Sequence, residues 1–443
     1  MSGKRGLRVK GPFSPQGDIK VPGDKSISHR AALLLALSNG TAKVHGFLKS
    51  DDCMATVKAL RSMGVRIDFE NESTLVVTGA GLTGLSEPPD VIDCGNSGTL
   101  MRLILGILAG QSFTTFLTGD ASLRSRPMDR VIDPLRAMGA TILARGRDKH
   151  PPIAIRGGSL SQIVYSPPVA SAQVKSSILL AGLFADGETE VRELRMTRDH
   201  TERMLEYLGA QVFRSAGSVK VRGNCELVAK DIVVPGDISS AAFAICAAAA
   251  SPGSHLTVRG VGVNPTRTGL LRVLERMGAD IEVLDERIVS NEPVADLVVH
   301  GKQLQAVVIQ PDEIPDIIDE IPILSLVATQ CTGTTSILGA GELRVKESDR
   351  LRSIEDVLTR LGASVSVIGN DIKVIGPTRL KPCTVESFGD HRIAMMAAMA
   401  AAFVDGVIDV RDTGCIDTSF PGFERVLTEL STIDSVESYS FMG

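Results

Sequence analysis

The sequence predicts an α/β protein of two similar domains, each built from three related repeats that contain helices and strands. Two observations carry this prediction. The segment VPGDKSISHRAALLLA at 21–36 returns as VPGDISSAAFAICAAA at 234–249, an offset close to half of the 443 residues. A second signature, L-x-x-[ML]-G-[AV]-x-[IV], recurs several times in each half. Self-similarity on these two scales indicates a duplicated domain that is itself assembled from smaller repeats.

The L-x-x-[ML]-G signature predicts one helix end in each repeat. Glycine accepts the left-handed conformation that commonly terminates a helix, and the β-branched residues that follow indicate a strand. The copies are LRSMGVRI from Leu60, LRAMGATI from Leu135, LEYLGAQV from Leu205, LERMGADI from Leu274, LTRLGASV from Leu358 and a degenerate LTELSTI from Leu427.

Six other helices lie between these copies and are rich in Ala, Leu and Ile on nearly all sides. Such helices are expected to be buried, with the more charged helices nearer solvent. Each domain therefore has a core of buried helices wrapped by sheets and outer helices. We expect a glycine to close each buried helix, namely Gly40, Gly110, Gly187, Gly253, Gly333 and Gly406.

Pro-Gly pairs at Pro22–Gly23 and Pro235–Gly236 predict the points where the chain crosses between the domains, since this pair interrupts regular structure. From its position, the segment before the first crossing is expected to pack with the second half.

The composition excludes several classes of protein. No apolar run reaches about 18 residues without a charge or turn signal, and the N-terminus has no apolar signal region, so we expect a cytoplasmic protein with no membrane partner. Seven Cys without a C-x-x-C pair or a Cys/His cluster argue against disulfides and against a metal site. A net charge of −5 and the absence of Trp argue against a nucleic-acid partner.

The two copies of the long repeat differ in charge. The first carries Lys25, His29 and Arg30 where the second has apolar residues. Duplication explains the shared residues but not basic groups kept in one copy, so the first copy is expected to carry chemistry. Other basic residues also follow or precede predicted helix starts, namely Arg102, Arg124, Arg126, Lys175, Arg195, Arg198, Arg344, Lys346, Arg350, Arg352 and Arg392.

Each of these basic residues alone is explained by a surface ion pair, and each Ser, Asn or Asp at a helix start by capping. Their recurrence at corresponding points of different repeats favours a polyanion site between the domains. Arginine pairs with phosphate and carboxylate in bidentate geometry, and helix N-termini bind anions.

Acidic residues accompany the basic ones at two helix starts. Asp319 and Glu320 precede an apolar helix in IIDEIPIL, and Glu347 follows Lys346 in KESDR. Either site is explained by the helix dipole or by proton transfer to and from a substrate. The match GAGLTG at 79–84 is followed by two prolines, so a dinucleotide cofactor is not expected. No covalent nucleophile is evident, which favours direct transfer.

Nine motifs in order resemble the 5-enolpyruvylshikimate-3-phosphate synthase family over nearly the whole chain. They are PGDKSISHR, GNSGTLMR, SRPMDR, ASAQVKS, TRDHTERML, PGDISSAAF, DEIPIL, ELRVKESDRL and GDHRIAM, with ASAQVKS and RVKESDRLR closer to the second class of these enzymes. The resemblance implies the enolpyruvyl transferase fold, two domains of three βαβαββ units each. It places one domain at 21–236 and the other at 1–20 and 237–443.

The reaction implied is transfer of the enolpyruvyl group of phosphoenolpyruvate to the 5-hydroxyl of shikimate 3-phosphate, with release of phosphate and without a cofactor or metal. The resemblance assigns catalysis to Lys25, Asp319 and Glu347, without deciding which carboxylate is base and which acid. It assigns shikimate 3-phosphate binding to Lys25, Ser26, Arg30, Ser171, Ala172, Gln173, Arg198, Asp319 and Lys346. It assigns phosphoenolpyruvate binding to Lys25, Gly98, Arg126, Gln173, Arg350 and Arg392.

Two positions depart from the family pattern. Thr418 stands where many members have a Lys before T-F-P, and Leu103 where many have Pro. Gly98 is the residue whose replacement by Ala accompanies glyphosate tolerance in some second-class members, so glyphosate is an expected inhibitor here. We expect a monomer.

The alternative functions are a UDP-N-acetylglucosamine enolpyruvyl transferase and a non-catalytic binding protein built from repeats. The first is disfavoured by Ser26, where Asn is expected after the Lys. The acidic composition and the asymmetry of the two copies weigh against the second.

Overall fold

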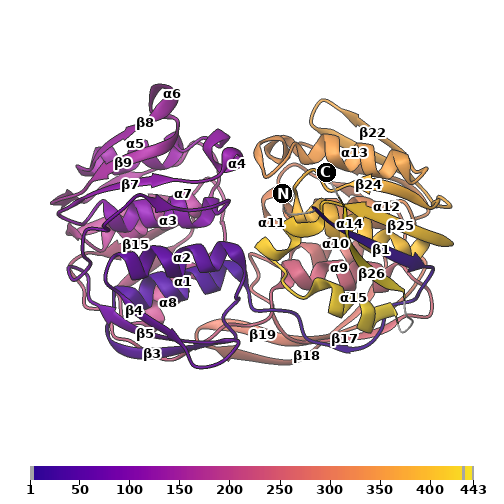
Figure 1. Ribbon diagram of the computed structural model, residues 1–443, viewed down its shortest axis with the longest axis horizontal. Coiled ribbons are helices and arrows are strands. Elements are labelled where there is room, and N and C mark those ends of the chain that lie inside the picture. The colour runs from indigo at the N-terminus through magenta and orange to yellow at the C-terminus, as the bar shows by residue number, and fades with distance from the viewer. Residues whose placement is uncertain (1–3, 432–434, 442–443) are drawn as a thin grey trace. The chain divides into compact units, whose positions relative to one another are not determined.

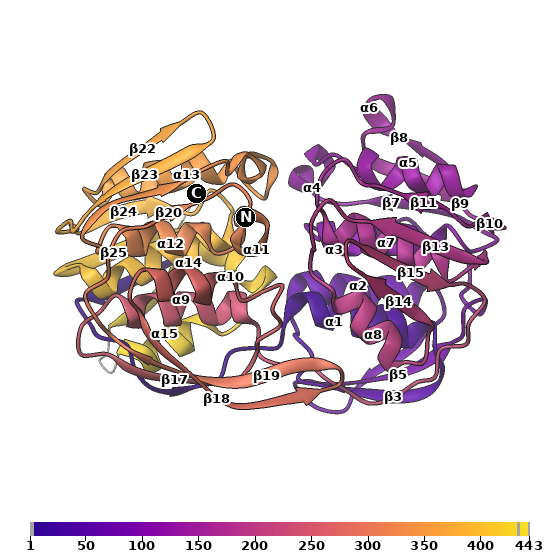
Figure 2. The same ribbon diagram turned by 180° about the vertical axis from the view of Figure 1, so that it is seen from behind.

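The structure, a computed structural model, describes residues 4–431 and 435–441. Its contacts divide the chain into two compact units (Figures 1 and 2). Unit 2 comprises Gly23–Val234 and the short segment Val289–Glu292, and unit 1 comprises the rest. The Pro-Gly pairs at 22–23 and 235–236 lie at two of the points where the chain passes from one unit to the other. No pattern in the sequence predicts that residues 289–292 belong to unit 2.

Each unit contains three four-stranded sheets with one shared pattern. In every sheet an edge strand pairs in parallel with its neighbour, and that neighbour is antiparallel to the next strand. The sheets of unit 2 are β16 (Ile232–Val233), β3 (Asn39–His45), β5 (Thr74–Ala80) and β4 (Arg66–Phe69); β6 (Ile92–Asp93), β7 (Thr114–Thr118), β9 (His150–Arg156) and β8 (Thr141–Ala144); and β11 (Val164–Tyr165), β13 (Glu188–Arg192), β15 (Ser218–Arg222) and β14 (Val212–Ser215). A two-stranded sheet joins β10 (Leu160–Ser161) to β12 (Ala185–Asp186).

The N-terminal segment completes two of the three sheets of unit 1. Strand β1 is the antiparallel partner of both β25 and β26, and β2 pairs in parallel with β17. The sheets are β18 (Asp280–Val289), β19 (Glu292–His300), β17 (His255–Gly262) and β2 (Gln16–Ile19); β20 (Val308–Ile309), β21 (Gly333–Ile337), β23 (Asp371–Gly376) and β22 (Ser364–Ile368); and β24 (Cys383–Glu386), β25 (Gly406–Arg411), β1 (Lys4–Gly11) and β26 (Val436–Phe441).

The helices form an inner and an outer set in each unit. The inner helices are α1 (Lys25–Ala36), α3 (Gly98–Leu108) and α7 (Ala172–Gly182) in unit 2, and α9 (Ile238–Ala249), α12 (Ile321–Ala328) and α14 (His391–Met399) in unit 1. The outer helices are α2 (Asp51–Ser62), α5 (Asp129–Met138), α8 (His200–Tyr207), α10 (Gly269–Arg276), α13 (Arg350–Arg360) and α15 (Phe423–Ser431). Short helices are α4 (Ala121–Ser125), α6 (Arg145–Asp148), α11 (Ile314–Ile317) and the 3₁₀ turns η1 (Gly341–Val345), η2 (Ala400–Phe403) and η3 (Thr413–Thr418).

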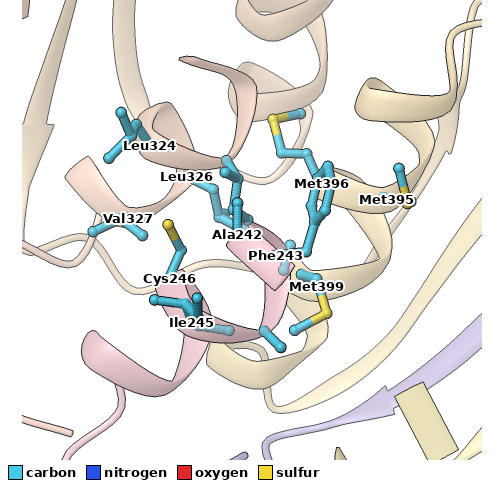
Figure 3. Close-up of a cluster of buried hydrophobic side chains, with 14 of the residues drawn as sticks. Ala242, Phe243, Ile245, Cys246, Leu324, Leu326, Val327, Met395, Met396 and Met399 are labelled. Carbon is cyan, nitrogen blue, oxygen red and sulfur yellow. The ribbon is translucent and has the colours of Figure 1, made fainter. Parts of the chain in front are cut away.

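The inner helices are buried around their whole circumference, as their composition predicts. Every residue of α9 is buried. Figure 3 shows this helix packed against α12 and α14 through side chains that include Phe243, Leu326 and Met396. A helix this apolar is stable only when other elements cover all of its faces, and here the other helices and the sheets provide that cover.

The glycines of the L-x-x-[ML]-G signature end the outer helices, and this prediction is confirmed. Their φ angles are +86° at Gly64, +118° at Gly139, +99° at Gly209, +88° at Gly278 and +83° at Gly362. Such values cost little only for glycine.

The expectation that a glycine closes each buried helix was wrong. Helix α1 ends at Ala36 with a right-handed cap at Leu37, and Gly40 lies inside β3. Gly333 and Gly406 likewise open the strands that follow α12 and α14.

No helix among the described residues is long and apolar enough to cross a membrane. The same residues contain no group of three or more His, Cys, Asp or Glu that could hold a metal ion.

Phe243 provides a test of the inner core of unit 1. Its side chain is 2% exposed and its ring meets that of Phe423 edge-on. Phe243→Ala is expected to lower the free energy of unfolding by about 3–5 kcal/mol, because removal of a buried ring loses apolar contact and leaves a cavity. Phe213 on β14 is 48% exposed, and Phe213→Ala is expected to change it by less than about 0.5 kcal/mol. Denaturant unfolding of the two variants measures both changes. Equal unfolding midpoints would contradict the packing of Phe243 in the core.

Candidate active site

Lys25 stands at the first residue of α1, where the sequence locates the start of a buried helix. Asp24 caps that helix, because its Oδ1 accepts the N–H of Ile27 at 2.9 Å. The Lys25 amine lies 3.0 Å from Oδ2 of Asp52, which belongs to the first turn of α2. Both side chains remain partly accessible, at 18% and 10%. The pair therefore offers an amine and a carboxylate at the edge of an otherwise buried helix start.

Arg30 is a buried cation that joins three helices. Its Nε donates to Thr201 Oγ1 of α8 at 2.7 Å and its Nη2 donates to Ser176 Oγ of α7 at 3.0 Å. Its Nη1 donates to the carbonyl of Ser26 at 2.9 Å. Burial lowers the pKa of Arg30 to about 10, although the Glu202 and Asp24 carboxylates oppose this. Three of its five N–H donors thus form hydrogen bonds within the protein, and the residue connects α1 to α7 and α8.

The start of α3 meets the start of α7 through Arg102 and Gln173. Arg102 Nη1 donates to Gln173 Oε1 at 2.8 Å, and Gln173 Nε2 donates to Thr99 Oγ1 at 3.0 Å. Ser97 caps α3 and Ser171 caps α7 through their hydroxyl oxygens. The structure therefore brings two helix N-termini and a guanidinium together, as an anion site requires.

Gly98 lies beneath two guanidinium groups. A Cβ at this position would lie 2.8 Å from Nη1 of Arg102 and 3.3 Å from Nη1 of Arg126. Arg126 is oriented by Asn96, whose Oδ1 accepts its Nη2 at 2.6 Å. Any side chain at Gly98 would have to displace one of these cations.

The remaining predicted residues of unit 2 lie at or just before the starts of α1, α7 and α8. Ala172 is the first residue of α7, Ser26 is the second of α1, and both are partly exposed. Arg198 is half-buried in the loop before α8, and its charge contributes to the lowered pKa of Arg30.

In unit 1, Arg350 gathers three carboxylates. Its Nε lies 2.8 Å from Asp390 Oδ2, its Nη2 lies 2.5 Å from Glu347 Oε2, and its Nη1 lies 3.5 Å from Asp319 Oδ1. Its side chain is only 1% exposed. Burial acts to lower the pKa of Arg350, but the three carboxylates outweigh this and raise it above its ordinary value. The guanidinium is therefore held as a permanent cation between Asp319 and Glu347.

Arg392 approaches Asp319 from another direction. Its Nη1 donates to the Asp319 carbonyl at 2.9 Å, and its Nε lies 3.7 Å from the Asp319 carboxylate. Lys346 follows η1 directly and is partly exposed. The structure thus brings Asp319, Glu347, Arg350 and Arg392 together within unit 1.

The second copy of the long repeat is not without charge, contrary to what its sequence suggests. Arg267, from a distant loop, donates to Asp237 at 3.1 Å and to Ser239 Oγ at 2.7 Å. Ser239 in turn donates to the buried Glu320. A cation therefore stands beside the second copy too, but it is 4% exposed and engaged by the protein.

Three residues that contact the predicted site residues were not predicted from the sequence. Asp52 pairs with Lys25, Asn96 orients Arg126, and Asp390 both caps α14 and pairs with Arg350. Asp390 and Asn96 stand inside the motifs GDHR and GNSGT, so their position before a helix was a usable signal. Asp52 gave no signal beyond an acidic helix start.

A family model described as EPSP synthase (3-phosphoshikimate 1-carboxyvinyltransferase) matches residues 9–427. The chain belongs to the EPSP synthase family.

The relatives cover nearly the whole chain. The 3-phosphoshikimate 1-carboxyvinyltransferase of Geotalea uraniireducens is 53% identical over 95% of this chain and 98% of its own length. That of Desulforudis audaxviator is 51% identical over 96% and 99%. The solved EPSP synthase of Acinetobacter baumannii has a TM-score of 0.88 and 41% identity over 99% of this chain and 100% of that chain. The enolpyruvyl transferase NikO of Streptomyces tendae has a TM-score of 0.80 at 16% identity over 99% of each chain, which shows the shared fold.

These matches confirm the family, the fold class and the enolpyruvyl transfer reaction of the shikimate pathway that the motifs predicted. The alternative functions are not favoured.

His29 adds a pH-dependent element beneath the site. Its Nδ1 lies 2.7 Å from Thr56 Oγ1, and its Nε2 is buried without a hydrogen-bond partner among the described residues. Burial and then the charges of Lys25 and Arg30 hold the pKa of His29 well below its usual value. The folded protein therefore keeps this imidazole neutral while the unfolded chain protonates it near pH 6.5.

The consequence is a loss of stability as the pH falls below about 6.5, because the unfolded state then binds a proton that the folded state does not. His29→Gln should weaken this dependence, by up to about 1.4 kcal/mol per pH unit for one proton. Unfolding of wild type and His29→Gln at pH 7.5 and 5.5 measures the difference. The same loss in both proteins would contradict a neutral buried His29.

Proposed function

We propose that residues of both units bind the two substrates of the EPSP synthase reaction and move its protons. The observation that carries this proposal is the anion site of unit 2, where the starts of α3 and α7 and the Arg102 and Arg126 guanidiniums converge on Gly98. Phosphoenolpyruvate and shikimate 3-phosphate together carry two phosphates and two carboxylates, which require such a set of cations and N–H donors.

Shikimate 3-phosphate is assigned mainly to the helix starts of α1 and α7. Lys25 and Ser26 at the first of these, and Ser171, Ala172 and Gln173 at the second, present hydroxyl, amide and N–H donors. Arg30 has two donors beyond those it uses within the protein, and Arg198 lies near it. In unit 1, Asp319 and Lys346 complete the assignment.

We assign the binding of phosphoenolpyruvate to three arginines and to Gly98. Arg126, Arg350 and Arg392 supply guanidiniums for its phosphate and carboxylate, while Gln173 and Lys25 are shared with the other substrate. The absence of a side chain at Gly98 lets a small anion approach the N-terminal end of α3, where the helix dipole is positive.

The chemistry requires an addition followed by an elimination. A proton moves to the methylene carbon of phosphoenolpyruvate, the 5-hydroxyl oxygen bonds to the neighbouring carbon and loses its proton, and phosphate then departs as the methyl group returns a proton. We assign protonation of the methylene to Lys25, whose amine faces the Asp52 carboxylate. Asp319 faces the 5-hydroxyl, and Glu347 is the second acid or base.

Arg350 supports both carboxylates in this scheme. It contacts Asp319 and Glu347 at once, so each is oriented by the same fixed cation. General acid–base groups positioned in this way typically contribute about 10²–10⁴-fold to the rate. We further propose that the enzyme is monomeric and cytoplasmic, and that glyphosate binds in place of phosphoenolpyruvate.

Phosphate release from phosphoenolpyruvate tests the function and the role of Lys25. Wild type is expected to release phosphate with shikimate 3-phosphate and not with UDP-N-acetylglucosamine. Lys25→Met is expected to lower kcat by about 10²–10⁴-fold, because the proton donor and a substrate contact are lost.

Lys43→Met is the matched control, since Lys43 also pairs with a carboxylate, Glu70, but is 41% exposed on β3. It is expected to retain wild-type turnover. Release of phosphate with the sugar nucleotide alone would refute the function, and near-normal turnover by Lys25→Met would refute its role.

Gly98→Ala tests the approach of phosphoenolpyruvate to α3. The added methyl group would lie 2.8 Å from Arg102 Nη1, so it displaces that cation and narrows the space above the helix. We expect KM for phosphoenolpyruvate and the inhibition constant of glyphosate both to rise, with KM for shikimate 3-phosphate changed by less than about twofold, since a local clash acts on the adjacent ligand. Steady-state kinetics with each substrate varied measures this, and unchanged glyphosate inhibition would count against the assignment.

A further inference from the structure

A buried lysine that the mechanism does not use lies in α7, one turn after its first residue. Lys175 is 1% exposed, and its Nζ lies 2.7 Å from Oε1 of Glu202 and 3.0 Å from Oε2 of Glu193. Glu202 belongs to α8 and is 3% exposed. A buried lysine retains its charge only when opposite charges compensate for the lost hydration, and here two carboxylates do so.

The same cluster closes the loop that precedes α8. Glu193 Oε1 accepts the backbone N–H of Thr197 at 3.0 Å and its hydroxyl at 2.5 Å, while Lys175 donates to the Thr197 carbonyl at 3.3 Å. Both ends of the 193–197 segment are thereby bound to one amine on α7. Leu194 and Met196 within it are 72% and 68% exposed, so apolar packing does not hold the segment down.

This loop leads directly to Arg198, and α7 begins with Ser171 and Gln173. Lys175 therefore connects two groups of residues that the proposed function assigns to shikimate 3-phosphate. A second contact joins the same elements, because Thr201 Oγ1 of α8 donates to Ser176 Oγ of α7 at 2.7 Å. That contact joins α8 to α7, whereas Lys175 and Glu193 hold Thr197 in the loop before it.

We propose that Lys175 is a positioning residue for shikimate 3-phosphate, which holds the 193–199 loop against α7 so that Arg198 faces the substrate. The inference rests on the proposed function, since it concerns the same binding site. Lys175 itself does not touch the substrate, because its amine is enclosed by Glu193, Glu202 and the Thr197 carbonyl.

The charges of this cluster explain why a neutral residue at position 175 would not hold the loop in place. Burial raises the pKa of Glu202, and Lys175 opposes that rise. Without the lysine, two carboxylates would face each other in a buried space without their cation. Glu193 would then turn outward to water and release Thr197, and the loop would move with it.

Lys175→Met is the primary test, because it is expected to weaken the binding of shikimate 3-phosphate but not that of phosphoenolpyruvate. KM and the calorimetric Kd for shikimate 3-phosphate are expected to rise on the order of tenfold, because a misplaced binding group loses much of its contribution. KM for phosphoenolpyruvate and kcat are expected to change by less than about twofold. Lys175→Arg, which keeps the cation, is expected to recover most of the affinity.

Two further variants keep the test decisive. Thr197→Val removes only the hydroxyl that Glu193 holds, and it is expected to raise the same Kd about threefold in a fully folded protein.

Lys220→Met is the matched control, since Lys220 on β15 lies 3.6 Å from Glu190 and 3.8 Å from Glu188 but is 39% exposed. Lys220→Met is expected to leave the KM values of both substrates and the Kd for shikimate 3-phosphate unchanged.

The inference is overturned if folded Thr197→Val and Lys175→Met bind shikimate 3-phosphate as tightly as wild type. It is also overturned if Lys175→Met weakens both substrates equally, since that would show a general structural defect. Failure of the wild type to bind shikimate 3-phosphate in the same titration would instead refute the proposed function and this inference with it.

Discussion

The structure depends on one constraint, which is that six helices are buried around their whole circumference. A helix start leaves N–H groups without partners, and inside a protein these must be satisfied by side chains or by a ligand. Five of the six inner helices meet this need with an Asp or Ser cap, namely Asp24, Ser97, Ser171, Asp237 and Asp390. The buried core therefore requires polar residues at the helix starts, and the proposed binding residues lie beside those caps.

Buried charge follows from the same constraint, because several cations near these helix starts are enclosed by the protein's own acceptors. Arg350 is held by three carboxylates, Lys175 by two, and Arg267 by a carboxylate and a hydroxyl. In a buried setting a cation without such partners is strongly disfavoured, whereas a paired one is fixed in position. The pairing thus orients groups that would be mobile on a surface, and orientation is what the binding of small anions demands.

Cations that look alike in the sequence differ in exposure and in partners in the structure. Lys25 and Lys175 both follow capped helix starts, yet the first is 18% exposed and the second 1%. Arg267 stands in no motif, yet it supplies the charge that the second long repeat lacks. Exposure and partners, rather than residue type, therefore distinguish Lys25 from Lys175.

Much of this protein is readable from its sequence. Periodic apolar helices and recurrent glycines identified the repeats and the buried helices, because helix burial and left-handed helix ends impose local requirements on residue type. The ordered motifs supplied the residues that are proposed for the site. The partners of those residues were decided by the tertiary structure alone. Asp52 reaches Lys25, Asp390 reaches Arg350, and Glu202 reaches Lys175 only after separate helices pack side by side. The excursion of 289–292 into unit 2 depends likewise on contacts between distant segments, which no local pattern records.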